Sequence, residues 1–127
     1  MIVVDTSVWV AALRTDGGEA KNLRALLDDD EVLLAIPVKI ELLSGTSQRQ
    51  RAVLRSALSA LPLAYPTDDT WRLMHLWTDR SARAGVAFGV GDLLIAALAH
   101  EAGALVWSLD AAFERLERLR LIDLYEP

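Results

Sequence analysis

Residues 1–10 read MIVVDTSVWV, and this stretch decides how the rest of the chain is interpreted. Residues 2–4 are a short β-branched run, typical of a strand buried on both faces, and residues 6–14 carry apolar side chains at helical spacing. Asp5 lies at the junction. An aspartate there could cap the helix by accepting from its exposed amides, or it could hold a ligand. The stretch alone does not separate these two roles.

The alternation of strand and helix continues along the chain. We expect further strands at residues 32–36, 61–65, 104–108 and 121–125, and further helices at residues 19–27, 37–44, 47–61, 68–84, 92–102 and 110–116. Continuously apolar strands separated by helices indicate an α/β fold with a parallel sheet covered on both faces. In such sheets ligands bind beyond the carboxyl ends of the strands, which is where Asp5 lies.

The composition limits the class of protein. A chain of 127 residues is long enough for one domain with a real core, and we expect a single domain over residues 1–127. No apolar run approaches the roughly 18 to 20 residues that a membrane span requires, so we expect no membrane partner. The absence of cysteine excludes disulfides, thiolate metal sites and cysteine nucleophiles. It is also compatible with the cytoplasmic location that we expect.

The net charge of −5 has the wrong sign for a protein that attracts nucleic acid in bulk. Binding of nucleic acid would have to depend on local arginines or on bound cations. The sequence favours none of the candidate arginines over the others. The candidates are Arg14, Arg49, Arg51, Arg55, Arg80 and Arg83.

Glu41 is the acidic residue that is hardest to explain structurally. It lies within PVKIELLSG (residues 37–45), a helical segment with apolar residues on both sides, so the pattern predicts that Glu41 is buried. A buried carboxylate without a partner costs several kcal/mol, so something must compensate it. The alternative to a functional role is a structural salt bridge.

Two further acids stand where a helix begins. Asp92 opens an apolar helix after Gly85, Gly89 and Gly91, where the helix dipole favours an anion. Asp110 follows the strand at residues 104–108 and could cap the next helix. Each position has a plain structural explanation when it is taken alone.

Taken together, these residues resemble a known family, the PIN domain, and within it the VapC-type ribonuclease toxins of toxin-antitoxin pairs. The resemblance covers essentially the whole chain. It is carried by IVVDTSVWV, PVKIELLSG with Glu41, GDLLIAALA with Asp92, and WSLDAAFERL with Ser108 and Asp110. The order and spacing of these motifs make the combination specific.

The resemblance implies a three-layer α/β/α fold, with a parallel sheet of about five strands and the four acids converging at its carboxyl edge. Two unit charges about 5 Å apart repel by roughly 3 kcal/mol at an effective dielectric of about 20, so such a cluster needs protons or cations. By resemblance, Asp5 and Asp92 are the principal ligands of Mg²⁺ or Mn²⁺, and Glu41 and Asp110 complete the site directly or through water. One of the acids would help to deprotonate the attacking water.

The implied activity is metal-dependent hydrolysis of RNA phosphodiester bonds by an endoribonuclease. The hydroxyls of Thr6, Ser7 and Ser108 could orient a carboxylate or the substrate phosphate, or they could cap local structure. The implied partners are RNA, a cognate VapB-type antitoxin and a second copy of the chain in a homodimer. A DNA-directed metal nuclease and a non-catalytic PIN-like scaffold remain the alternatives.

Overall fold

The computed structural model describes residues 1–127 and follows the expected alternation of strands and helices. The strands are β1 (Ile2–Val4), β2 (Val32–Ala35), β3 (Leu63–Ala64) and β4 (Leu105–Trp107). The helices are α1 (Thr6–Arg14), α2 (Gly18–Asp28), α3 (Ile36–Ser44), α4 (Gln48–Ser59), α5 (Asp68–Arg83), α6 (Val90–Ala102) and α7 (Ala111–Arg118). The expected helix boundaries are met to within two residues. No helix is both long and apolar enough to cross a membrane.

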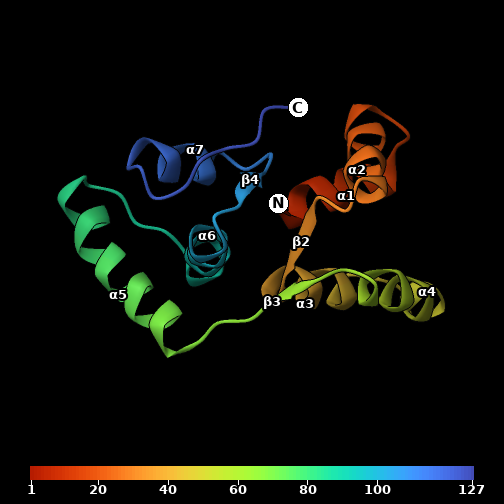
Figure 1. Cartoon of the computed structure of the whole chain (residues 1–127), viewed down its shortest axis with the longest axis horizontal. Helices are drawn as coiled ribbons and strands as arrows, with labels where there is room; N and C mark the ends of the chain where they lie inside the picture. The colour runs from red at the N-terminus through yellow and green to blue at the C-terminus, as the bar shows by residue number, and fades with distance from the viewer.

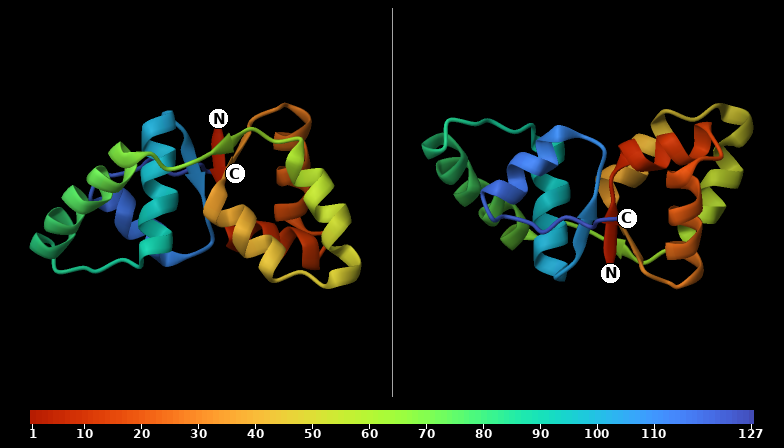
Figure 2. Two further views of the ribbon diagram at one scale, coloured as in Figure 1. Left: turned by 90° about the horizontal axis from the view of Figure 1, so that it is seen from below. Right: turned by 90° about the horizontal axis from the view of Figure 1, so that it is seen from above.

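The four strands form one parallel sheet in the order β3-β2-β1-β4. Helices α5, α6 and α7 lie on one side of this sheet and α1 to α4 on the other (Figure 1, Figure 2). The α/β/α prediction is therefore confirmed. From β1 the chain adds β2 and β3 toward one edge of the sheet, and it then returns to place β4 on the other side of β1. The strand order therefore reverses between β1 and β4. Ligand sites of parallel sheets form at such switch points, beyond the carboxyl ends of the strands.

The sheet has four strands rather than about five, because residues 121–125 do not form the expected last strand. They make a single parallel bridge, through Leu124, to β4. The backbone of Leu121 is engaged elsewhere: its amide donates to the Leu116 carbonyl, and its carbonyl oxygen lies 3.0 Å from Nδ1 of His100. These bonds remove the groups that a longer ladder would need.

The hydrophobic core runs along both faces of the sheet. All three residues of β1 are buried, as a strand covered on both sides requires. Helix α6 packs across β1, β2 and β4, and Ala96, Ala97 and Ala99 are completely buried on it. Small side chains allow the helix backbone to approach the sheet closely, which fixes α6 relative to the carboxyl ends of the strands.

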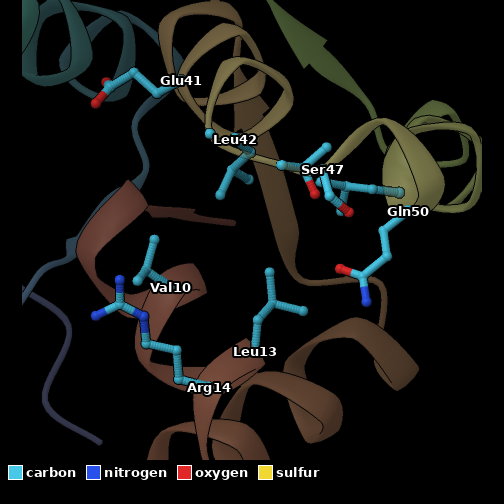
Figure 3. A pocket seen from close by; sticks show the side chains of 10 residues that line it. Val10, Leu13, Arg14, Glu41, Leu42, Ser47 and Gln50 are labelled. Atoms are coloured by element: carbon cyan, nitrogen blue, oxygen red, sulfur yellow. The ribbon is translucent and has the colours of Figure 1, made fainter.

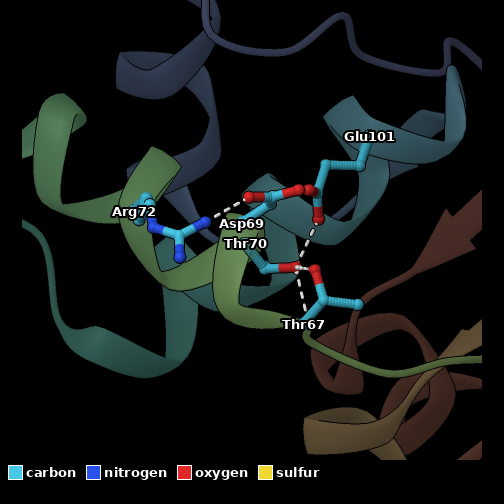
Figure 4. A network of polar contacts seen from close by, with 5 residues as sticks. All are labelled: Thr67, Asp69, Thr70, Arg72 and Glu101. Atoms are coloured by element: carbon cyan, nitrogen blue, oxygen red, sulfur yellow. Dashed lines mark hydrogen bonds and ion pairs between the residues drawn. The ribbon is translucent and has the colours of Figure 1, made fainter.

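Helix α5 is tied to the end of α6 by a polar network (Figure 4). Thr67 and Thr70 form a capping box at the start of α5, and the Thr70 hydroxyl donates to Glu101 at 2.6 Å. At its other end, α6 begins two residues earlier than expected, so Gly91 lies within the helix rather than in the preceding loop. Asp92 is therefore in the first turn of α6 rather than at its opening residue.

Candidate active site

The carboxyl ends of β1 and β4 bring Asp5 beside Ser108. Val4 pairs with Trp107, and the Asp5 amide donates to the Trp107 carbonyl at 2.9 Å. Asp5 is only 6% exposed, one of three buried polar or charged residues in the chain. A buried carboxylate needs hydrogen-bond partners or a compensating charge. The groups around Asp5 must therefore supply those hydrogen bonds or that charge.

Two serine hydroxyls hold the Asp5 carboxylate. Ser7 Oγ donates to Asp5 Oδ2 at 2.7 Å, and Ser108 Oγ donates to the same oxygen at 2.8 Å. The two serines also receive backbone hydrogen bonds, from the amide of Leu109 to Ser7 and from the amide of Asp110 to Ser108. Both serine hydroxyls therefore orient a carboxylate, and Ser108 also caps the backbone that follows it.

The two aspartates at helix starts behave differently. Asp5 occupies the N-cap position of α1 but makes no side-chain capping hydrogen bond, so its carboxylate is not used to cap the helix. Asp110 does cap α7, since its Oδ1 accepts from the Ala112 amide at 2.9 Å. Capping occupies one oxygen of Asp110 and leaves the second free for another ligand.

Glu41 is exposed, so the prediction that it is buried is wrong. On α3 only Val38 and Leu42 are buried, whereas Ile40 is 57% exposed. The apolar residues of α3 are spread over two faces: Val38 and Leu42 are buried on one, whereas on the other Leu43 packs only partly against the core. Glu41 forms no ion pair, so the alternative of a structural salt bridge is also wrong.

The four acids nevertheless share one electrostatic environment. Partial desolvation of the carboxylate, followed by the charges of Asp5 and Asp92, raises the pKa of Glu41. Desolvation, followed by the charges of Asp110 and Asp5, raises the pKa of Asp92. Each acid therefore acts on at least one other, as like charges gathered at one edge must. Mutual repulsion of the acids favours the binding of a cation at this edge.

The donor atoms at this edge fit a hydrated divalent cation. They are all oxygen, which Mg²⁺ and Mn²⁺ prefer. No three acidic or histidine side chains are already arranged to hold an ion, but Mg²⁺ keeps several waters and commonly uses only one or two carboxylates. Thr6 Oγ1 is buried without a hydrogen-bond partner and approaches Glu41 closely enough to lower its pKa. A water bound at the site would satisfy that hydroxyl.

The raised pKa values predict how stability depends on pH. A carboxyl group whose pKa is raised by folding destabilises the folded protein above that pKa, and the penalty disappears as the pH falls below the value in the unfolded chain. In metal-free buffer we expect Glu41→Gln to melt slightly above the wild type at pH 7, since solvent screens this exposed side chain, and at the same temperature at pH 4. Thermal unfolding followed by circular dichroism measures this. A difference in Tm that does not change with pH would contradict the assignment.

Arg115 is a residue that the sequence interpretation missed. The ion pair on α7 joins Arg118 to Glu114, and Arg115 forms none. Its charge instead lowers the pKa of Asp92, against the larger effects that raise it. The sequence feature that could have identified Arg115 is its position on the helix that Asp110 caps.

A groove leads away from the acids on the side of α1, α3 and α4. It has a volume of about 330 Å³, and Glu41 and Arg14 lie at one end of it, with Ser47 and Gln50 at the other (Figure 3). The groove therefore connects the carboxylate cluster to the surface of α4.

Comparison with known proteins assigns nearly the whole chain to one family. Residues 2–119 match the PIN domain family. The chain is 32% identical over 126 residues to VapC ribonuclease Mb1587 of Mycobacterium bovis and to ribonuclease VapC11 of Mycobacterium tuberculosis, covering 94% of this chain and 93% of each relative. A toxin-antitoxin complex from Klebsiella pneumoniae has a chain of the same fold, with a TM-score of 0.79, 14% identity and 100% of both chains covered. The match to the family over nearly the full length, together with these relatives, shows that the chain belongs to the PIN domain family.

Proposed function

We propose that this protein is a metal-dependent endoribonuclease and the toxin of a toxin-antitoxin pair. The observation that carries the proposal is the set of four coupled acids, Asp5, Glu41, Asp92 and Asp110, beyond the carboxyl ends of β1 and β4. The mycobacterial relatives, which are named ribonucleases, support the choice of RNA as substrate. Residues 1–127 would act as one domain, because a single cluster of 27 buried residues joins the elements on both sides of the sheet.

In this proposal the four acids have different roles. Asp5, oriented by Ser7 and Ser108, and Asp92 would hold the metal, and Glu41 and Asp110 would complete the site directly or through water. A bound Mg²⁺ or Mn²⁺ lowers the pKa of a coordinated water and stabilises charge on the phosphoryl oxygens. Glu41 is exposed and its pKa is raised, so we assign it the role of the base that accepts a proton from the attacking water. The water oxygen bonds to phosphorus as the bond to the leaving ribose oxygen breaks.

The test is cleavage of a structured RNA by the purified protein. We expect cleavage with Mg²⁺ or Mn²⁺ and none with EDTA, because the acids alone repel the phosphate. A DNA strand of the same sequence serves as the control for substrate class. Absence of RNA cleavage in either metal would overturn the proposal, and equal cleavage of DNA would replace it with the DNA-directed alternative.

The proposal also includes partners and a location. An antitoxin would bind the toxin and block cleavage, as the toxin-antitoxin complex of the same fold suggests. We expect it to be a small DNA-binding protein encoded immediately upstream, whose addition stops cleavage. The homodimer and the cytoplasmic location remain predictions, and light scattering of the purified chain measures the first.

A further inference from the structure

Helix α4 and its flanking segments have a charge that differs from the rest of the chain. Residues 42–67 contain Arg49, Arg51 and Arg55 and no acidic residue, while the remaining residues hold 10 of the 13 basic and all 18 acidic residues. The three arginines are exposed, and none forms an ion pair. A net-acidic protein therefore presents one helix that is purely basic.

The stability of α4 does not explain these arginines. Arg49 and Arg51 lie in the first four residues of the helix, where the helix dipole favours negative charge and disfavours positive charge. The first turn contains no acidic residue, and Ser47 at the N-cap makes no side-chain capping hydrogen bond. A helix that carries charges against its dipole, with no structural gain, is a sign of a functional surface.

The position of α4 links these charges to the carboxylate cluster. Ser47, Gln50 and Leu54 line the same groove as Glu41 (Figure 3). Arg51 and Arg55 each follow a groove-lining residue and are four positions apart, so helical spacing places them next to each other on one side of the lining face, with Arg49, which precedes Gln50, on the other side. The basic surface therefore borders a depression that ends at Glu41.

Arg80 and Arg83 lack this setting, whereas Arg14 lines the groove itself. Arg80 and Arg83 share α5 with Asp68, Asp69 and Asp79, so that helix has no excess of positive charge. Arg14 lines the groove at the same end as Glu41, and an acidic residue follows it two positions later. The structure thus ranks arginines that the sequence could not separate.

We propose that α4 binds the phosphate backbone of the RNA substrate, with Arg49, Arg51 and Arg55 neutralising phosphates as the strand runs along the groove toward Glu41. This inference rests on the proposed ribonuclease function. Each phosphate neutralised by an arginine releases condensed counterions, so local contacts give affinity even though the net charge is negative. Arg14 then lies where the strand would reach the acids.

The test measures binding of single-stranded RNA by the Asp92→Asn protein, which keeps the RNA intact during the measurement. We compare it with the same protein carrying Arg49→Ala, Arg51→Ala and Arg55→Ala, since alanine preserves the helix. With about 0.7 counterions released per phosphate of a single strand, losing three contacts should weaken binding about 100-fold at 0.1 M salt. The slope of log affinity against log salt should fall by about 2.

A matched control removes the same charge elsewhere. Lys21, Arg24 and Arg72 are exposed on α2 and α5, and their replacement by alanine should change RNA affinity less than about threefold at 0.1 M salt, because no phosphate contact is lost. Equal weakening by both triple variants would mean that only net charge matters, and no weakening by either would also overturn the inference. Loss of antitoxin binding by the α4 variant with unchanged RNA binding would make α4 a protein interface instead.

Cleavage assays separate this inference from the proposed function. With Asp92 restored, the α4 variant should cleave a dinucleotide, which covers only the bond that breaks, at the wild-type kcat. It should cleave long RNA with a raised KM. If the wild type cleaves no RNA, the proposed function fails; if it cleaves long RNA and the α4 variant has the same KM, only the inference about α4 fails.

Discussion

The Asp92→Asn variant should cleave RNA at least about 10³-fold more slowly than the wild type, which corresponds to a loss of about 4 kcal/mol of transition-state stabilisation. Asparagine keeps the size of the side chain but removes a charge that a divalent cation requires. Asp92 lies in the first turn of α6, a helix fixed by its packing across three strands, so the loss should not come from misfolding. Initial rates at saturating Mg²⁺ measure the effect.

A control and a second readout make this prediction specific to the site. Asp79 is an exposed aspartate on α5 without an ion pair, and Asp79→Asn removes the same charge but should keep the wild-type rate. In metal-free Asp92→Asn, the pKa of Glu41 should fall toward its ordinary value of 4.5, because one of the charges that raises it is gone. NMR titration of the glutamate carboxyl carbon measures this. A normal rate in Asp92→Asn would remove Asp92 from the site, and an unchanged pKa of Glu41 would show that the two acids are not coupled.

The sequence predicted the elements that depend on local pattern. The β-branched run at residues 2–4 and the glycine at position 103, which adopts a φ of 65° at the end of α6, are signals that act within a few residues. The position of Asp5 at the carboxyl end of its strand follows from the same pattern. These predictions needed no knowledge of which strands are neighbours.

The contact between Asp5 and Ser108 could not be predicted in the same way. It joins residues 103 positions apart and exists because β4 pairs with β1 rather than with β3. Periodicity identifies strands but does not give their order in the sheet. The sequence therefore left the role of Ser108 open, and the pairing of β4 with β1 adds the contact with Asp5 to the local bond that Ser108 accepts from the Asp110 amide.

The errors at Glu41 and at residues 121–125 have a common origin. Helical spacing shows which residues of α3 share a face, but not which face the core covers, and Ile40 proves to be exposed. Likewise, an apolar run predicts a strand but does not show whether its backbone groups are free to pair. At Leu121 they are occupied by the end of α7 and by His100. Both outcomes depend on tertiary contacts that no short stretch of sequence contains.

Asp5→Asn should reduce cleavage by about 10³-fold or more while leaving the fold intact. The amide oxygen of asparagine can accept from Ser7 and Ser108 as Asp5 Oδ2 does, so the buried hydrogen bonds survive. Removing one negative charge also relieves repulsion with Glu41 and Asp92 in the metal-free protein. The Tm should therefore be unchanged or slightly raised, as differential scanning calorimetry in EDTA would show.

Asp5→Ala is the informative partner of that variant. It should lose the same activity but also lose stability, because the two serine hydroxyls remain at a buried site without their acceptor, at a cost of about 1–3 kcal/mol. A lowered Tm in both variants would mean that the negative charge of Asp5 itself supports the fold. An active Asp5→Asn protein with an unchanged Tm would mean that Asp5 serves only to join β1 to β4. Loss of activity in both variants, with loss of stability only in Asp5→Ala, is the result expected if the serines serve to hold a metal-binding carboxylate in place.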